Sequence, residues 1–91
     1  MIAHALIEIN DSTPTQVTPA GVESSTSITL QIQNLGTSNV YIGAAGLTSS
    51  SYGALVAPKA TLSIDSLYPG DEVFALSASG TGSVAVLRVN R

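Results

Sequence analysis

The sequence predicts an all-β fold, an antiparallel β-sandwich of about seven or eight short strands with jelly-roll or Greek-key connections. Apolar residues recur with a period of two, and no segment shows the 3.6-residue period of a helix. Strand-like runs also recur at the roughly 8 to 12 residue intervals expected of small sandwiches, with turn-forming residues between them. The 91 residues fit one such domain, so residues 1–91 are assigned to a single β-sandwich.

The first strand is expected over residues 2–9, where Ala3, Ala5, Ile7 and Ile9 share one face. Residues 10–25 are the least periodic part of the chain and contain two prolines, at positions 14 and 19. Two interpretations of this segment stay open. It is either an arm, or an irregular edge segment with a short strand over residues 15–18. The flanking prolines have no N–H group to donate, and at a sheet edge this loss breaks no hydrogen bonds between strands.

The middle of the chain alternates most regularly. Residues 26–34 place Ile28, Leu30 and Ile32 on one face and polar residues on the other, which predicts a strand with one wet side. A loop over 34–39 leads into a strand at 40–43, and the two strands are expected to pair. Spaced glycines and serines in residues 43–60 indicate a surface loop with a short strand near 54–57.

The last third predicts three more strands. Residues 61–65 direct Leu62 and Ile64 to the core, and a type II turn is expected over residues 68–71. A strand over 72–78 places Phe74, Leu76 and Ala78 on one face. A turn at 79–82 then predicts a hairpin with a strand over 83–89.

The final strand is apolar on both faces, with Val84 and Val86 on one and Ala85, Leu87 and Val89 on the other. Such a strand needs cover from its own fold or from a neighbouring subunit. Because no helix is predicted to supply that cover, we expect a neighbour. The candidate oligomer or capsid interface is therefore Val84, Val86, Leu87 and Val89. Arg88 and Arg91 are expected to be solvated or paired with a carboxylate.

Composition restricts the function classes. Charged residues make up 10% of the chain, against about 25% in typical soluble domains, so the polar surface must be uncharged. Burying such a surface loses little hydration, which favours an assembled state, although an ordinary β domain with polar loops is the alternative. Three basic residues against six acidic ones disfavour nucleic-acid binding. No apolar run reaches the roughly 18 residues that span a bilayer, and no basic flank indicates a signal peptide.

No catalytic, cofactor or metal site is predicted. Cysteine is absent, and the single histidine, His4, shares a strand face with Glu8, which is a common surface arrangement. Asp11 is one carboxylate among hydroxyls, too few ligands for calcium. Nucleophilic catalysis needs a nucleophile, a base and an orienting group together, and these are missing.

A longer pattern carries a family resemblance. It comprises Gln33-Asn34-Leu35-Gly36-Thr37-Ser38-Asn39-Val40-Tyr41-Ile42-Gly43, then Pro58 to Ile64, Pro69-Gly70-Asp71-Glu72, Ala78-Ser79-Gly80-Thr81-Gly82 and Val84-Ala85-Val86-Leu87-Arg88. This pattern resembles small tailed-bacteriophage virion proteins, chiefly head accessory or capsid-decoration proteins. The resemblance covers about residues 26–88, whereas residues 10–21 depart from it.

The resemblance implies a small β protein that binds the outside of an assembled phage head, often as a trimer, and stabilises it against internal DNA pressure. Its partner would be the major capsid protein, and it would be located on the capsid surface. The missing basic flank of a signal peptide separately predicts that it is made in the host cytoplasm. The alternative is a tail-associated or glycan-binding module that uses Tyr41 and Tyr52 as stacking platforms beside the loop over 43–53.

Overall fold

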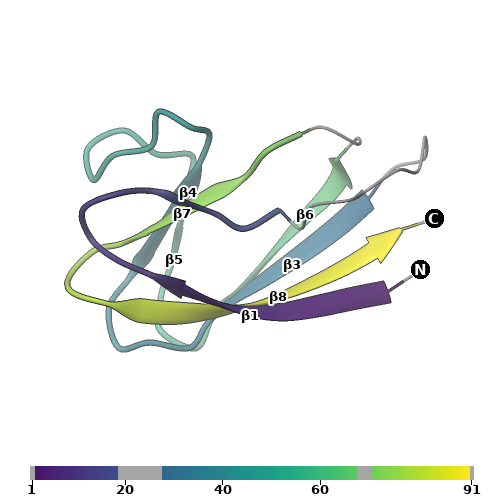
Figure 1. Cartoon of the computed structure of the whole chain (residues 1–91), viewed down its shortest axis with the longest axis horizontal. Coiled ribbons are helices and arrows are strands. Elements are labelled where there is room, and N and C mark those ends of the chain that lie inside the picture. Colours follow the sequence, from purple (N-terminus) through teal and green to yellow (C-terminus); the bar gives the residue numbers. More distant parts are fainter. Residues whose placement is uncertain (1, 19–27, 68–70, 91) are drawn as a thin grey trace.

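The computed structural model describes residues 2–18, 28–67 and 71–90, and within these ranges it contains eight strands and no helix (Figure 1). The strands are β1 (Ile2–Ile9), β2 (Thr15–Gln16), β3 (Ile28–Asn34), β4 (Val40–Gly43), β5 (Ala54–Val56), β6 (Thr61–Leu67), β7 (Phe74–Ser77) and β8 (Gly82–Asn90).

The strands form two antiparallel sheets of four. Sheet A has the order β1-β8-β3-β6, and sheet B has the order β2-β7-β4-β5. Strand β1 pairs with β8, β2 with β7, β3 with β6 and β4 with β5, so the chain is one long hairpin in its pairing. The additional pairs β3–β8 and β4–β7 wrap this hairpin into two layers. This nested pairing is a jelly roll, and the predicted fold class is confirmed.

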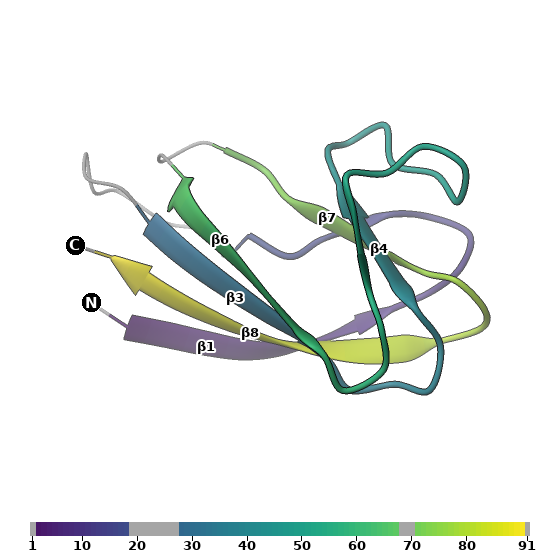
Figure 2. The same cartoon turned by 180° about the vertical axis from the view of Figure 1, so that it is seen from behind.

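The core lies between the sheets and follows the period-two alternation of each strand. Strand β3 buries Ile28, Leu30 and Ile32, as predicted, and Leu62 and Ile64 of β6 pack against the same cluster. Sheet B contributes further apolar side chains from the opposite layer: Val40, Ile42, Val56 and Ala75. Figure 2 shows the sandwich from behind, with the loop that joins β4 to β5 at the far end from both termini.

Two predicted strand pairings are wrong. Strands β3 and β4 do not pair, because β3 belongs to sheet A and β4 to sheet B, and the same is true of β7 and β8. Turn residues separate the strands in both places, although Gly82 already belongs to β8. Both connections cross the gap of about 10 Å between the layers instead of returning along the same sheet. Turn chemistry shows where a strand ends, and it does not show which sheet the next strand joins.

The described part of the irregular segment, residues 10–18, belongs to the sandwich. Val17 is fully buried, and its N–H donates to the Val73 carbonyl at 2.8 Å. Strand β2 lies at the edge of sheet B, which agrees with the edge interpretation for these residues. Residues 19–25, and the predicted turn apart from Asp71, lie outside the described residues.

Candidate assembly surface

The outer face of sheet A changes in character from one edge to the other. On the side of β1 and β8 the register brings together Ile2 with Val89, His4 with Leu87 and Leu6 with Ala85. Toward β3 and β6 most outward residues are uncharged and polar, namely Thr29, Gln31, Gln33, Thr61 and Ser63, and Asp65 of β6 is exposed as well. The apolar set of Ile2, Leu6, Ala85, Leu87 and Val89 is called the apolar strip below.

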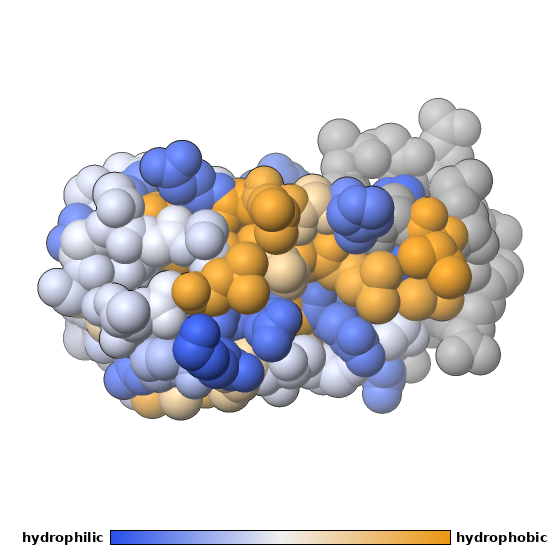
Figure 3. Space-filling view, turned by 90° about the horizontal axis from the view of Figure 1, so that it is seen from below, coloured by the Kyte–Doolittle hydropathy of each residue, from blue (hydrophilic) through white to orange (hydrophobic). Residues whose placement is uncertain are grey.

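The apolar strip is exposed at its outer edge. Ile2 is 68% exposed and Leu6 is 75% exposed, the two largest values among the apolar side chains left open in the described residues. Leu87 and Val89 are half-buried beside them. Figure 3, seen from the side on which β1 and β8 lie in Figure 1, shows apolar surface running along this side between polar residues. A monomeric domain usually covers such side chains, so this strip is the strongest candidate contact surface on sheet A.

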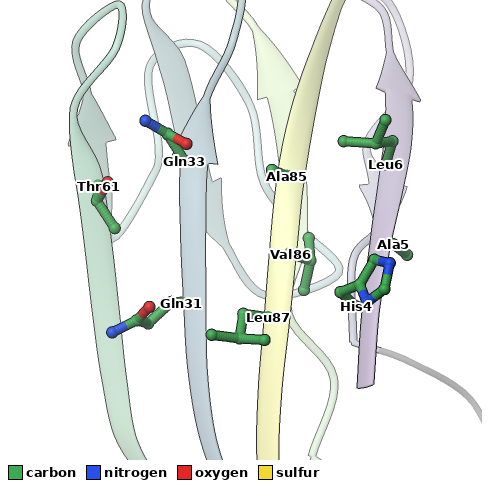
Figure 4. Close-up of a pocket in the computed structure, with 9 residues that line it drawn as sticks. All are labelled: His4, Ala5, Leu6, Gln31, Gln33, Thr61, Ala85, Val86 and Leu87. Carbon is green, nitrogen blue, oxygen red and sulfur yellow. The ribbon is translucent and has the colours of Figure 1, made fainter. Parts of the chain in front are cut away.

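A shallow depression lies across the middle of this face (Figure 4). His4, Leu87 and Gln31 line it at one level on β1, β8 and β3, and Leu6 and Gln33 line it at the next. The depression is open to solvent, and its described lining contains no carboxylate. Its amide and imidazole groups suit hydrogen bonds to a flat polar partner surface rather than enclosure of a small molecule.

The prediction that Val84 and Val86 form an interface is wrong. Val84 is 0% exposed and Val86 is 2% exposed, and both pack in the core between the sheets. The cover on that side of β8 is the chain's own second sheet, so no helix is needed there. Leu87 and Val89 lie on the opposite, outer face, so their role in an interface stays a prediction.

The expectation that Arg88 is solvated is wrong, and its pairing with a carboxylate stays a prediction. It was expected to be solvated or paired with a carboxylate, yet it is only 7% exposed. Its Nε and Nη1 atoms are buried and have no hydrogen-bond partner among the described residues. Arg88 lies on the same face of β8 as the buried valines, because alternate residues of a strand share a face. Strand alternation alone therefore predicts that it points inward. Arg91 lies outside the described residues.

The two predicted loop contacts, Tyr41 and Tyr52, contact each other. Tyr41 lies on β4 and Tyr52 in the loop before β5, and their ring centroids are 4.6 Å apart with the planes tilted by 39°. Tyr52 is 47% exposed and Leu55 is 49% exposed. Tyr41 pairs across the sheet with Leu55 and with the buried Leu76 of β7. Tyr41, Tyr52 and Leu55 therefore form a second apolar area on the outer face of sheet B.

The described residues contain no group of three or more His, Cys, Asp or Glu side chains that could hold a metal ion. His4 and Glu8 share the outer face of β1, and both are exposed. Asp71 and Glu72 precede β7 and are exposed as well. No helix among the described residues has the length and hydropathy needed to cross a membrane.

Comparisons with known proteins do not assign a family. No protein-family model matches the chain, and no curated protein matches it. Among solved structures, the chain is similar to one described as "Bacillus endospore appendages form a novel family of disulfide-linked pili". That match has 16% identity and a TM-score of 0.49, and it covers 99% of this chain and 87% of the other.

Proposed function

We propose that this protein is a structural virion component, a decoration or cement protein that binds the outside of a phage head and stabilises it. The observation that supports this best is the apolar strip on the outer face of sheet A, with Ile2 and Leu6 exposed beside a charge-poor polar surface. The sequence resemblance to phage head accessory proteins supplies the choice of partner, the major capsid protein.

The size of this face explains why such a protein would work in many copies. Four strands about 4.8 Å apart and about eight residues of 3.3 Å each give a face of about 500 Å². A stable interface of standard size needs about 800 Å² on each partner. One chain on its own therefore binds weakly. Oligomers, of which the resemblance implies a trimer, placed on a repeating shell would convert weak contacts into firm retention.

The test uses purified protein and phage heads that lack it. We expect the protein to sediment with the heads at saturating, lattice-like stoichiometry and to raise the temperature at which they release DNA. Because the surface is poor in charge, retention should change little between 50 and about 300 mM salt, unlike binding driven by screened ion pairs. Heads that neither retain the protein nor gain heat resistance would count decisively against the proposal.

A second candidate, a glycan-binding or tail-associated module, is favoured by one observation, the exposed Tyr52 ring held against Tyr41 beside Leu55. Aromatic rings with one open face can stack on sugar rings. On this alternative, a glycan array gives binding that Tyr52→Ala abolishes while Leu6→Ala leaves it intact. Absence of any binding by the wild-type protein on such an array would rule out this candidate.

A further inference from the structure

The four sheet edges differ in how well they are protected against pairing with another chain. A free edge strand presents unpaired N–H and C=O groups, and proteins blunt it with short length, bulges, proline or charge. At the edges of sheet B, β2 has two residues and β5 has three. At one edge of sheet A, β6 carries an extra residue in a register shift against β3 near the exposed Asp65.

Strand β1 has almost none of these protections. Its eight residues, Ile2–Ile9, pair with β8 in one unbroken register, without a bulge, and contain no proline or lysine. No described backbone group outside β8 pairs with it along that length. Its outward residues are Ile2, His4, Leu6 and Glu8, so a single carboxylate near its end is its only formal charge. A long, unbulged, largely apolar edge of this kind is a template for strand addition.

We propose that β1 pairs antiparallel with β1 of a second copy of this chain about a twofold axis. The two edges are the same surface, so the contact is isologous and closes after two copies. It joins two four-stranded sheets into one of eight strands. This contact gives a dimer, whereas the family resemblance implies a trimer. It does not rest on the capsid proposal, because it can form between isolated chains in solution.

The side chains that would lie opposite each other favour one register for the pair. A twofold axis perpendicular to the sheet leaves each side chain on the same face of the sheet. Residues that lie opposite each other must also share a face, so the axis must pass through a residue position and not between two residues. With the axis at Leu6, the two Leu6 side chains meet, and each His4 lies opposite Glu8 of the second copy. With the axis at Ala5, His4 would face Leu6 and Ile2 would face Glu8, which are mismatched pairs. The Leu6 register is therefore the one proposed.

The pairing has a consequence for the outer face. A perpendicular twofold axis leaves both outer faces on the same side, so the two apolar strips become neighbours in one surface. The combined face of about 1,000 Å² exceeds the roughly 800 Å² per partner of a standard interface. A second copy thus supplies the area that one chain lacks.

Disulfide trapping tests the register, and the natural chain contains no cysteine to interfere. In the proposed pair, two opposed Leu6 positions lie about 4.5 to 5.5 Å apart between Cα atoms, within the range that a disulfide spans. Leu6→Cys should give a covalent dimer on mild oxidation at about 10 μM. The control is His4→Cys on the same exposed face, whose two sulfurs would lie roughly 13 Å apart and stay unlinked.

Sedimentation of the cysteine-free protein tests the contact itself. We expect a concentration-dependent dimer whose dissociation constant rises at least about tenfold in Leu6→Lys, because a lysine on the edge opposes pairing. Leu55→Lys, an exposed leucine on the other sheet, should leave it unchanged. A wild-type monomer at about 1 mM, assemblies unaffected by Leu6→Lys, or equal trapping of Leu6→Cys and His4→Cys would overturn the proposal. Far-UV circular dichroism confirms that each variant is folded.

Discussion

At the scale of single residues, Asn34 secures the crossing from sheet A to sheet B. It is 1% exposed, and its Nδ2 donates to the carbonyls of Ser38 at 2.7 Å and Val56 at 3.0 Å. Its Oδ1 accepts from the Gly36 N–H at 2.9 Å. One buried amide therefore connects the end of β3, the loop after it and β5. The same residue lies in the motif that carries the family resemblance, and its role there is to hold the fold.

Asn34→Asp should lower the free energy of unfolding by about 2 to 3 kcal/mol, because a carboxylate cannot donate to the two carbonyls that it would face in the buried site. Urea denaturation measures this. Asn39→Asp, at an exposed position in the same loop, is the matched control and should change stability by less than about 0.5 kcal/mol. Equal effects of the two substitutions would mean that the Asn34 contacts contribute little.

At the scale of elements, alternate residues of β8 point to the core and to the outer surface of sheet A. Val84 and Val86 lie inside, and Leu87 lies on the outer face between His4 of β1 and Gln31 of β3. The chain's own packing therefore covers the apolar residues on only one face of this strand. The inner half belongs to the jelly-roll core, and the outer half is the part that an assembly would cover.

Substitution along β8 checks this division. Val86→Ala should lower the free energy of unfolding by about 2 kcal/mol, since it opens a cavity in a packed core. Leu87→Ala removes a larger side chain but should cost less than about 1 kcal/mol in the isolated protein, because that side chain is half-buried. Thermal and urea unfolding of both variants measure the difference. Losses of similar size would contradict the assignment of faces.

Strand alternation predicted most of the fold but less of the candidate surface. Period-two patterns predict the strands and the buried faces of β3 and β6, because side chains alternate between the two faces within each strand. Sheet membership depends on where a connection crosses, which the turn residues after Asn34 and Ser77 do not encode. The same limit misplaced Val84 and Val86, since a second sheet covers a strand as well as a neighbouring subunit would.

At the scale of the whole molecule, two apolar areas face away from the core on opposite layers. The apolar strip lies on sheet A, and Tyr41, Tyr52 and Leu55 lie on sheet B. The capsid proposal uses the first area and the glycan alternative uses the second. A substitution in one area leaves the other untouched because the core separates them, so the two functions can be tested with single variants of one protein.

The most direct measurement is a binding titration of wild-type protein, Leu87→Lys and Leu55→Lys on phage heads that lack the protein. Leu87 lies on the outer face of sheet A, one strand in from the β1 edge, so its substitution tests the face more than strand pairing. The capsid proposal predicts that Leu87→Lys weakens retention at least about tenfold, or about 1.4 kcal/mol, while Leu55→Lys binds like wild type. Unchanged retention of Leu87→Lys, or loss confined to Leu55→Lys, would contradict it.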